Sequence, residues 1–167
     1  GRKLLERISW WQDYVNRNKG SLNNNPTPGN KEGGLTTILE KSLGAAAKGG
    51  TTPLMDVLLY AERIKGKGFL FMDSPGYDPA SVTGQIASGC NIISFTTGRG
   101  SAFGSKPSPA IKISTNTKIY NHMIEDMDIN AGKIISDNSS VEEVGNEIFD
   151  LIIKVASGEQ SKSEKQG

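Results

Sequence analysis

The sequence predicts an α/β fold, a single domain in which a mostly parallel sheet is flanked by helices. Short apolar runs at residues 69–72, 91–95 and 110–114 have the length of buried strands, and helical stretches separate them. Near the N-terminus, residues 19–34 form a long loop rich in Gly, Pro and Asn. A chain of 167 residues with 35% apolar content is large enough to bury one core.

The elements before residue 69 are expected to be helical. Residues 3–18 carry apolar side chains at helical spacing and form the first predicted helix. Thr37 and Glu40 have the spacing of a capping box, so a second helix begins there and ends at the next glycine pair. Pro53 fits the first position of a third helix, which is expected to run to about Ile64.

Beyond the first predicted strand, helices and strands are expected to alternate. Asp78 and Pro79 have the types preferred at the N-cap and first position of a helix, which would run to Gly89. A polar, helix-like stretch follows the strand at residues 110–114, and Ile134–Ile135 is the expected fourth strand.

The last predicted helix begins at a capping box formed by Ser140 and Glu143 and ends at Gly158. Its apolar residues fall on one face, and the sequence after it is polar and charged. The predicted organisation has four parts. Residues 1–18 form a helix continuing from a missing N-terminal part, and residues 19–34 form a mobile loop. Residues 35–158 form an α/β domain, and residues 159–167 form a polar tail.

Composition narrows the class of partner. Nineteen basic and eighteen acidic residues give a net charge of +1, so we expect no nucleic acid and a small molecule instead. No apolar run approaches the ~20 residues that span a bilayer, and the N-terminus lacks a signal-peptide pattern, which predicts a cytoplasmic protein with no membrane segment. One cysteine, Cys90, excludes an intrachain disulfide.

Three polar, glycine-bearing loops are the candidate binding segments. They occupy residues 25–34, residues 73–78 after the first predicted strand, and residues 96–104 after the second. In open parallel sheets, ligands bind beyond the carboxyl ends of the strands. The last two loops are therefore expected to emerge where a ligand would lie.

Together these loops resemble the C-terminal region of the altronate/galactarate dehydratase family, and most closely its altronate branch. The resemblance covers nearly the whole chain, in the order NPTPGNKEGGLTTILEKSLG, GGTTPLMDVLLYAE, MDSPGYDPASVTGQIASG, FTTGRGSAFG, DMDINAG and VASGEQSKSE. It implies a hydro-lyase of hexuronate catabolism that converts altronate to 2-keto-3-deoxygluconate plus water.

The resemblance also implies a divalent metal, Fe(2+), as cofactor, and the N-terminal portion of the same enzyme as partner. Galactarate dehydratase, sulfolactate sulfo-lyase and a non-catalytic sugar-acid-binding module stay open as alternatives. A homo-oligomer is left open too.

The dehydration chemistry suggests three catalytic candidates. Removing the proton alpha to a carboxylate and expelling the neighbouring hydroxyl needs a base, an acid and a cation near the developing charge. Arg99 is expected to bind the substrate carboxylate, because its planar fork matches two oxygens. Lys41 and Glu40 are the other candidates. They point about 100° apart on one helix, so one of them is expected to be structural.

The candidate substrate-binding residues lie in or beside the loops or, for Lys112, in a strand where an ammonium must pair or face a site. They are Asn30, Gly33, Gly34, Ser74, Gly76, Asp78, Thr97, Gly98, Gly100 and Lys112. Asp73, at the end of a predicted strand, is the metal candidate. His122 and Cys90 belong to no ligand-spaced cluster, so the sequence itself offers no convincing metal site.

Overall fold

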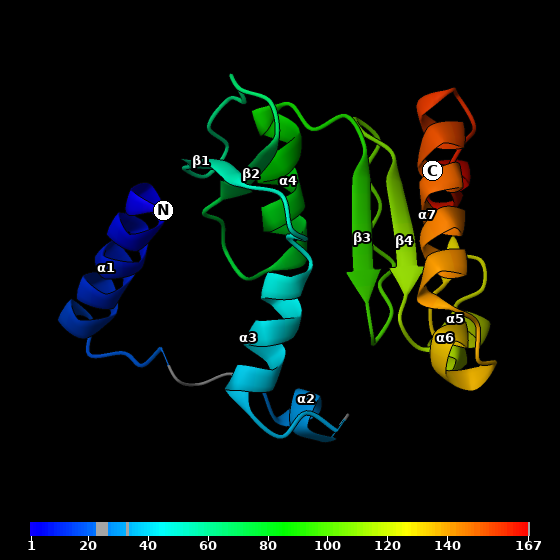
Figure 1. Ribbon diagram of the computed structural model, residues 1–167, viewed down its shortest axis with the longest axis horizontal. Helices are drawn as coiled ribbons and strands as arrows, with labels where there is room; N and C mark the ends of the chain where they lie inside the picture. The colour runs from blue at the N-terminus through cyan, green and yellow to red at the C-terminus, as the bar shows by residue number, and fades with distance from the viewer. Residues whose placement is uncertain (23–26, 33, 167) are drawn as a thin grey trace. The chain divides into compact units, whose positions relative to one another are not determined.

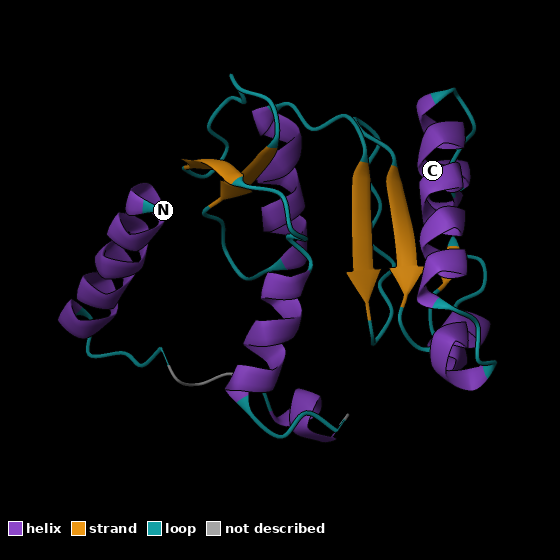
Figure 2. Cartoon of the chain, viewed as in Figure 1, coloured by secondary structure: helices purple, strands orange, loops and turns teal. Residues whose placement is uncertain are grey.

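The computed structural model describes residues 1–22, 27–32 and 34–166. It is an α/β structure in which small parallel sheets are flanked by helices, as the sequence predicts (Figure 1 and Figure 2). The chain divides into two compact units, Gly1–Ser74 and Pro75–Gly167, called unit 1 and unit 2. Within the described residues, no helix combines the length and the apolar character needed to cross a membrane.

Unit 1 contains a two-stranded parallel sheet, and its helices precede that sheet in the sequence. Its elements are α1 (Arg2–Arg17), α2 (Pro28–Glu32), α3 (Ile38–Ala47), β1 (Leu54–Leu58) and β2 (Phe69–Met72). The predicted first two helices are thus present. The loop between them contains the short helix α2, which its composition did not suggest.

The prediction of a helix from Pro53 to Ile64 is wrong, because Leu54–Leu58 forms strand β1. This strand pairs in parallel with β2, from Leu54 opposite Phe69 to Leu58 opposite Met72. Val57 and Leu58 are buried, at 7% and 5% exposure. A run of five residues with four apolar side chains is short for a helix, and a proline is tolerated just before a strand, so pairing with β2 decided the structure of this segment.

Unit 2 carries a three-stranded sheet in the order β3-β4-β5, with every pair parallel. Its elements are α4 (Asp78–Ser88), β3 (Ile93–Thr97), β4 (Ala110–Ser114), α5 (Thr117–His122), β5 (Ile129–Asn130), α6 (Lys133–Ser136), α7 (Val141–Ala156) and α8 (Lys162–Lys165). In Figure 1, β3 and β4 lie side by side and α7 runs alongside β4.

The central strand β4 is buried along its whole length. On one face, Ile111 and Ile113 form a cluster with Val155 of α7. Elsewhere in unit 2, Ala110 and Ile93 form a second cluster with Val82 of α4. Burial on both faces explains why β4 is a continuous apolar run apart from Lys112 and its terminal serine.

The fourth strand lies earlier than expected. The sequence pointed to Ile134–Ile135, but these residues belong to α6, and β5 is Ile129–Asn130. Ile129 pairs with Ile113 of β4 and is 4% exposed, whereas Ile135 is 86% exposed. Two adjacent apolar residues form a strand only where a neighbouring strand is free to pair with them. Here Ile129, and not Ile134–Ile135, pairs with β4.

The residues expected as a polar tail form α8 and pack on β4. Ser161, the N-cap of α8, is 1% exposed. The Lys162 N–H donates to Asp128 Oδ1 at 2.9 Å, and the Ser163 hydroxyl donates to the Ala110 carbonyl at 2.9 Å. Polar side chains here satisfy polar groups of the sheet, which a hydrophobicity pattern does not reveal.

The predicted capping box of α7 is present and should make unit 2 sensitive to acid. The Ser140 N–H donates to Glu143 Oε2 at 2.8 Å, and the Glu143 N–H donates to Ser140 Oγ at 3.0 Å. The bond from Ser140 lowers the pKa of Glu143. A carboxyl with a lowered folded-state pKa stabilises the fold above its unfolded-state pKa, and this contribution is lost as pH falls through the folded-state pKa.

We therefore expect Glu143→Gln to flatten part of the pH dependence of stability between about pH 6 and about pH 3, the range that includes the glutamate pKa. Urea unfolding of the wild type and the variant across this range measures the difference. Exposed Glu142, the neighbouring first-turn acid, provides the matched control as Glu142→Gln. Parallel stability curves for the wild type and Glu143→Gln would contradict the prediction.

Candidate functional site

The carboxyl ends of three parallel strands lie at one edge of the unit 2 sheet, the place where open parallel sheets bind ligands. β3 ends at Thr97, β4 at Ser114 and β5 at Asn130. The Thr115 N–H donates to the Thr97 carbonyl at 2.9 Å, and the Ala131 N–H donates to the Ser114 carbonyl at 2.8 Å. These bonds hold the loops that follow the strands beside one another.

A hollow of about 310 Å³ at this edge, here called the edge hollow, has hydroxyl and amide side chains in its lining. The Thr117 hydroxyl donates to Asn130 Oδ1 at 3.2 Å and lies 2.8 Å from Ser136 Oγ. Hydroxyls and amides both donate and accept hydrogen bonds, which suits a ligand with several hydroxyls. The lining residues are Thr115, Asn116, Thr117, Lys118, Gly132, Ile135 and Ser136.

Two glycines allow the loops to pack this closely. Gly132 is buried, and a Cβ there would lie 2.3 Å from the Thr117 backbone nitrogen. Gly100 has a φ of +84°, a left-handed conformation that favours glycine, and its Cβ would lie 2.2 Å from Met123 Sδ. The predicted residue Gly100 thus shapes the loop by its own lack of a side chain.

Arg99 lies on that loop between Gly98 and Gly100, and its side chain is exposed. Its backbone N–H donates to Thr97 Oγ1 at 3.4 Å. No carboxylate of the described residues forms a salt bridge with its guanidinium. A guanidinium placed in this way can take both oxygens of a ligand carboxylate.

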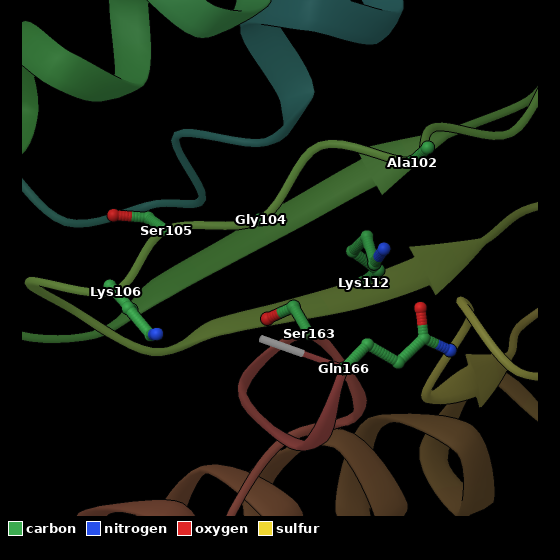
Figure 3. A pocket seen from close by; sticks show the side chains of 7 residues that line it. All are labelled: Ala102, Gly104, Ser105, Lys106, Lys112, Ser163 and Gln166. Atoms are coloured by element: carbon green, nitrogen blue, oxygen red, sulfur yellow. The ribbon is translucent and has the colours of Figure 1, made fainter.

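Lys112 lies in another pocket of unit 2, of about 360 Å³, here called the Lys112 pocket. Its side chain is 1% exposed, and Nζ donates to the Ser101 carbonyl at 3.2 Å and to Asp126 Oδ1 at 3.3 Å. Figure 3 shows this pocket. Its lining residues, none of which lines the edge hollow, are Ala102, Gly104, Ser105, Lys106, Lys112, Ser163 and Gln166.

In unit 1, two of the predicted residues contact each other. Lys41 Nζ donates to Asn30 Oδ1 at 2.9 Å and so links α3 to α2. Gly34 has a φ of +104° and its N–H donates to the Lys31 carbonyl at 2.9 Å, which ends α2. Gly33 lies outside the described residues.

Glu40 has a capping role at the start of α3. Its Oε2 accepts hydrogen bonds from the Thr36 N–H at 3.0 Å and from the Thr36 hydroxyl at 2.8 Å, while its own N–H donates to Thr37 Oγ1. The bond from the Thr36 N–H is the main cause of a lowered pKa at Glu40. These bonds give Glu40 a structural role at the N-terminus of α3.

The metal candidate Asp73 binds two side chains of α1. Arg7 contacts Asp73 Oδ2 through Nε at 2.8 Å and through Nη2 at 2.7 Å. Trp11 Nε1 donates to both carboxylate oxygens, at 2.9 and 3.0 Å. These contacts make Asp73 the residue that attaches α1 to the end of β2.

The remaining predicted residues are at the sequence junction of the two units. Ser74 is the last residue of unit 1, while Gly76 and Asp78 belong to unit 2 and are exposed. The N-cap of α4 is Tyr77, with extended backbone, and not Asp78 as expected. Asp78 instead places its carboxylate in the first turn, where the helix dipole favours negative charge.

No group of three or more His, Cys, Asp or Glu within the described ranges could hold a metal ion. Cys90 packs against the cluster that contains Ile93, and burial raises the pKa of its thiol. His122 is exposed at the end of α5. The described side chains therefore do not fit the ligand set of an iron site.

Sequence reasoning missed Thr115–Thr117 and Asn130 at the edge, and the α8 side of the Lys112 pocket. One signal was available, because the polar run Thr115–Thr117 follows strand 110–114 as the Thr97 loop follows its own strand. Ser163 and Gln166 had no such signal, since they fall in a segment whose composition is uniformly polar.

The chain is similar to known proteins over its whole length. A family model described as D-galactarate/Altronate dehydratase, C-terminal, matches residues 1–167. The chain is 41% identical over 160 residues to galactarate dehydratase (L-threo-forming) of Escherichia coli, which covers 96% of this chain and 31% of that protein. It is 39% identical over 163 residues to altronate dehydratase of Bacillus subtilis, covering 98% of this chain and 33% of that protein.

A further relative is the (2R)-sulfolactate sulfo-lyase subunit beta of Chromohalobacter salexigens, 36% identical over 143 residues, or 85% of this chain and 37% of that subunit. The chain thus spans about a third of the length of these relatives.

Proposed function

Because the chain belongs to the D-galactarate/altronate dehydratase family and corresponds to its C-terminal part, we propose that it is part of a hydro-lyase that removes water from a sugar acid. The geometric observation that carries the proposal is the edge of the unit 2 sheet. There an exposed guanidinium, Arg99, is on the loop after β3, and hydroxyl and amide groups line the hollow after β4. A sugar acid presents the same two features, a carboxylate and a row of hydroxyls.

In this proposal Arg99 binds the substrate carboxylate and offsets the negative charge that grows on it when the alpha proton leaves. The hydroxyls of Thr115 and Thr117 and the amide of Asn116 bind substrate hydroxyls and orient the one that is expelled. Lys41, in unit 1, is proposed separately, on sequence grounds, as a base of the complete enzyme.

The substrate is proposed to be altronate, as the sequence motifs favour, or galactarate. The identities to the two relatives, 39% and 41%, do not separate these acids. Sulfolactate is the third candidate, since the chain also matches a subunit of a sulfo-lyase.

The family resemblance suggests iron(II) as cofactor of the complete enzyme. When bound, such an ion would act as a Lewis acid on a substrate oxygen. Because the described residues do not fit an iron site, we assign no step of this chain to the metal.

The proposal is tested with the full-length protein that contains this chain, supplied with iron(II) under anaerobic conditions. Altronate, galactarate and sulfolactate are each offered, and formation of a 2-keto-3-deoxy acid is followed with the two sugar acids. Turnover of one sugar acid supports the proposal and identifies the substrate. Tight binding of a sugar acid without turnover would favour the non-catalytic binding module instead.

Arg99→Lys in the same protein is expected to raise KM about tenfold or more, because a point ammonium cannot make the two-pronged contact with a carboxylate. Steady-state kinetics with the preferred sugar acid measures the change. Arg17→Lys, at an exposed arginine on α1, is the matched control and should leave KM unchanged. An unaltered KM for Arg99→Lys would remove Arg99 from this role.

A further inference from the structure

Asn116 lines the edge hollow just after the central strand β4, and it is the N-cap residue of α5. Its side-chain Oδ1 accepts hydrogen bonds from the Lys118 N–H at 2.9 Å and from the Ile119 N–H at 3.3 Å. Backbone N–H groups only donate, so the side-chain atom that faces them must be the oxygen and not the nitrogen. The cap therefore fixes which end of the amide is left for a ligand.

The backbone of Asn116 is held as well. Its N–H donates to Ser114 Oγ at 3.3 Å, and its carbonyl accepts from the same hydroxyl at 2.9 Å. Ser114 ends strand β4 and is 0% exposed. A residue bonded through its N–H, its carbonyl and its side-chain oxygen has little freedom, so Nδ2 is held in place before a ligand arrives.

The side-chain nitrogen of Asn116 keeps both of its protons for a ligand. Within residues 1–22, 27–32 and 34–166, no group accepts a hydrogen bond from Nδ2. Lys118 is another side-chain donor in the lining, but it is exposed and forms no salt bridge with a described residue. Asn116 is thus the donor of the hollow whose position the contacts fix.

The hydroxyl groups of the lining have the opposite polarity. The Thr117 hydroxyl donates its one proton to Asn130 Oδ1 at 3.2 Å, so in its 2.8 Å contact with Ser136 Oγ it accepts and the serine donates. The Thr115 hydroxyl donates to the Thr97 carbonyl at 3.4 Å. Because their protons are in use, these oxygens offer lone pairs to the O–H groups of a ligand.

We propose that Asn116 is a catalytic residue of the hydro-lyase, and that its Nδ2 donates a hydrogen bond to the oxygen of the substrate hydroxyl that is expelled. This role rests on the proposed function. In the reaction the Cα–H bond breaks, the base of the complete enzyme takes the proton, and the electron pair of that bond forms the C=C bond. The C–O bond breaks with its electrons on the departing oxygen, which takes up a proton from the base or from solvent and leaves as water.

The polarity of the hollow suits this step. A hydrogen bond from Asn116 strengthens as negative charge grows on the departing oxygen, so it stabilises the transition state more than the bound substrate. An amide that is already fixed does not have to reorient during the reaction. The oxygens of Thr115 and Thr117 accept from the other substrate hydroxyls and hold the carbon chain of the sugar acid in place.

The test uses the full-length protein that contains this chain, with iron(II) and the sugar acid that it turns over. Asn116→Asp and Asn116→Ser keep the cap of α5, because aspartate and serine serve as N-caps about as well as asparagine. Aspartate lacks the amide donors, and the shorter serine side chain does not reach the place of Nδ2. We expect kcat to fall about a hundredfold in both variants, with KM little changed in the neutral serine variant.

Two controls separate this role from a structural one. Asn121→Asp, at an exposed asparagine of α5 outside the hollow, should keep the kcat of the wild type. Hydrogen exchange at the Lys118 and Ile119 amides, which report on the cap, should stay as slow in both Asn116 variants as in the wild type, and the melting temperature should not change.

The proposal is overturned if Asn116→Ser keeps the kcat of the wild type, even where Asn116→Asp loses it, because repulsion of the substrate carboxylate would then be the cause. A loss of kcat that accompanies faster exchange at Lys118 and Ile119 in both variants would leave Asn116 with the capping role alone. A wild type that turns over no sugar acid would reject the proposed function together with this role. An active wild type with equally active variants would reject only the role of Asn116.

Discussion

Gly132→Ala is expected to lower the free energy of unfolding of unit 2 by about 3 kcal/mol or more, or to prevent its folding. The new Cβ would lie 2.3 Å from the Thr117 nitrogen and 2.7 Å from the Asn116 carbonyl carbon. Both are backbone atoms, which cannot rotate away as a side chain could. Urea unfolding, followed by the far-ultraviolet circular dichroism signal, measures the loss.

Gly145→Ala is the matched control for this prediction. Gly145 is also in unit 2, on helix α7, and a Cβ there meets no atom within 4 Å. Alanine favours helix over glycine, so this variant should be as stable as the wild type or more stable by about 0.5–1 kcal/mol. If the two variants changed stability equally, the close approach at Gly132 would not be the cause.

Asp128→Ala is expected to destabilise unit 2 by about 2–3 kcal/mol, because it leaves two backbone donors without their acceptor. Asp128 Oδ2 accepts from the buried Lys112 N–H at 2.7 Å, and its Oδ1 accepts from the Lys162 N–H at 2.9 Å. One carboxylate therefore joins β4 to α8. Urea unfolding gives the overall loss, and hydrogen exchange reports whether residues 161–166 lose protection.

The local part of this prediction separates it from general destabilisation. Residues 161–166 should exchange faster in Asp128→Ala even under conditions where the rest of unit 2 stays folded. Asp150→Ala, at an exposed carboxylate of α7, is the control and should change neither measurement by much. Unchanged exchange at 161–166 would show that Asp128 does not hold α8 in place.

Elements with a strong local signal could be predicted from the sequence. The capping box at Ser140 and the Thr37 side-chain cap, which accepts from the Glu40 N–H, mark helix starts through hydrogen bonds between residues three positions apart. Strands β2 and β4 were found because each is a short apolar run between polar residues. In these cases the neighbours in sequence supply most of the interactions that define the element.

Elements defined by distant partners could not be predicted in the same way. Leu54–Leu58 becomes a strand because Phe69–Met72 lies beside it, and Ile129 becomes one because Ile113 does. The local signals at Pro53 and at Ile134–Ile135 pointed elsewhere. Pairing across a sheet therefore decided these assignments, and nothing in the flanking residues indicates it.

The candidate site could be predicted only in part, because some of its residues are placed by partners distant in sequence. The Thr97–Gly100 loop could be found from its glycines and from the strand before it. The contribution of Asn130 depended on the position of β5, and that of Ser163 depended on α8 folding back onto β4. Whether Arg99, Lys41 and the other predicted residues act on a substrate stays a prediction, and Arg99→Lys tests it for the first of them.

The docking of α8 on β4 also bears on the order in which the chain folds. The bond from Ser163 to Ala110 joins residues 53 positions apart, and that from Lys162 to Asp128 joins residues 34 positions apart. Contacts this distant in sequence form late, because the intervening chain must be ordered first. We infer that the α8 segment docks after the sheet has assembled. Pulse-labelling hydrogen exchange would show this as late protection of residues 161–166, and early protection would contradict it. The C-terminal segment would then complete the fold of unit 2 and not initiate it.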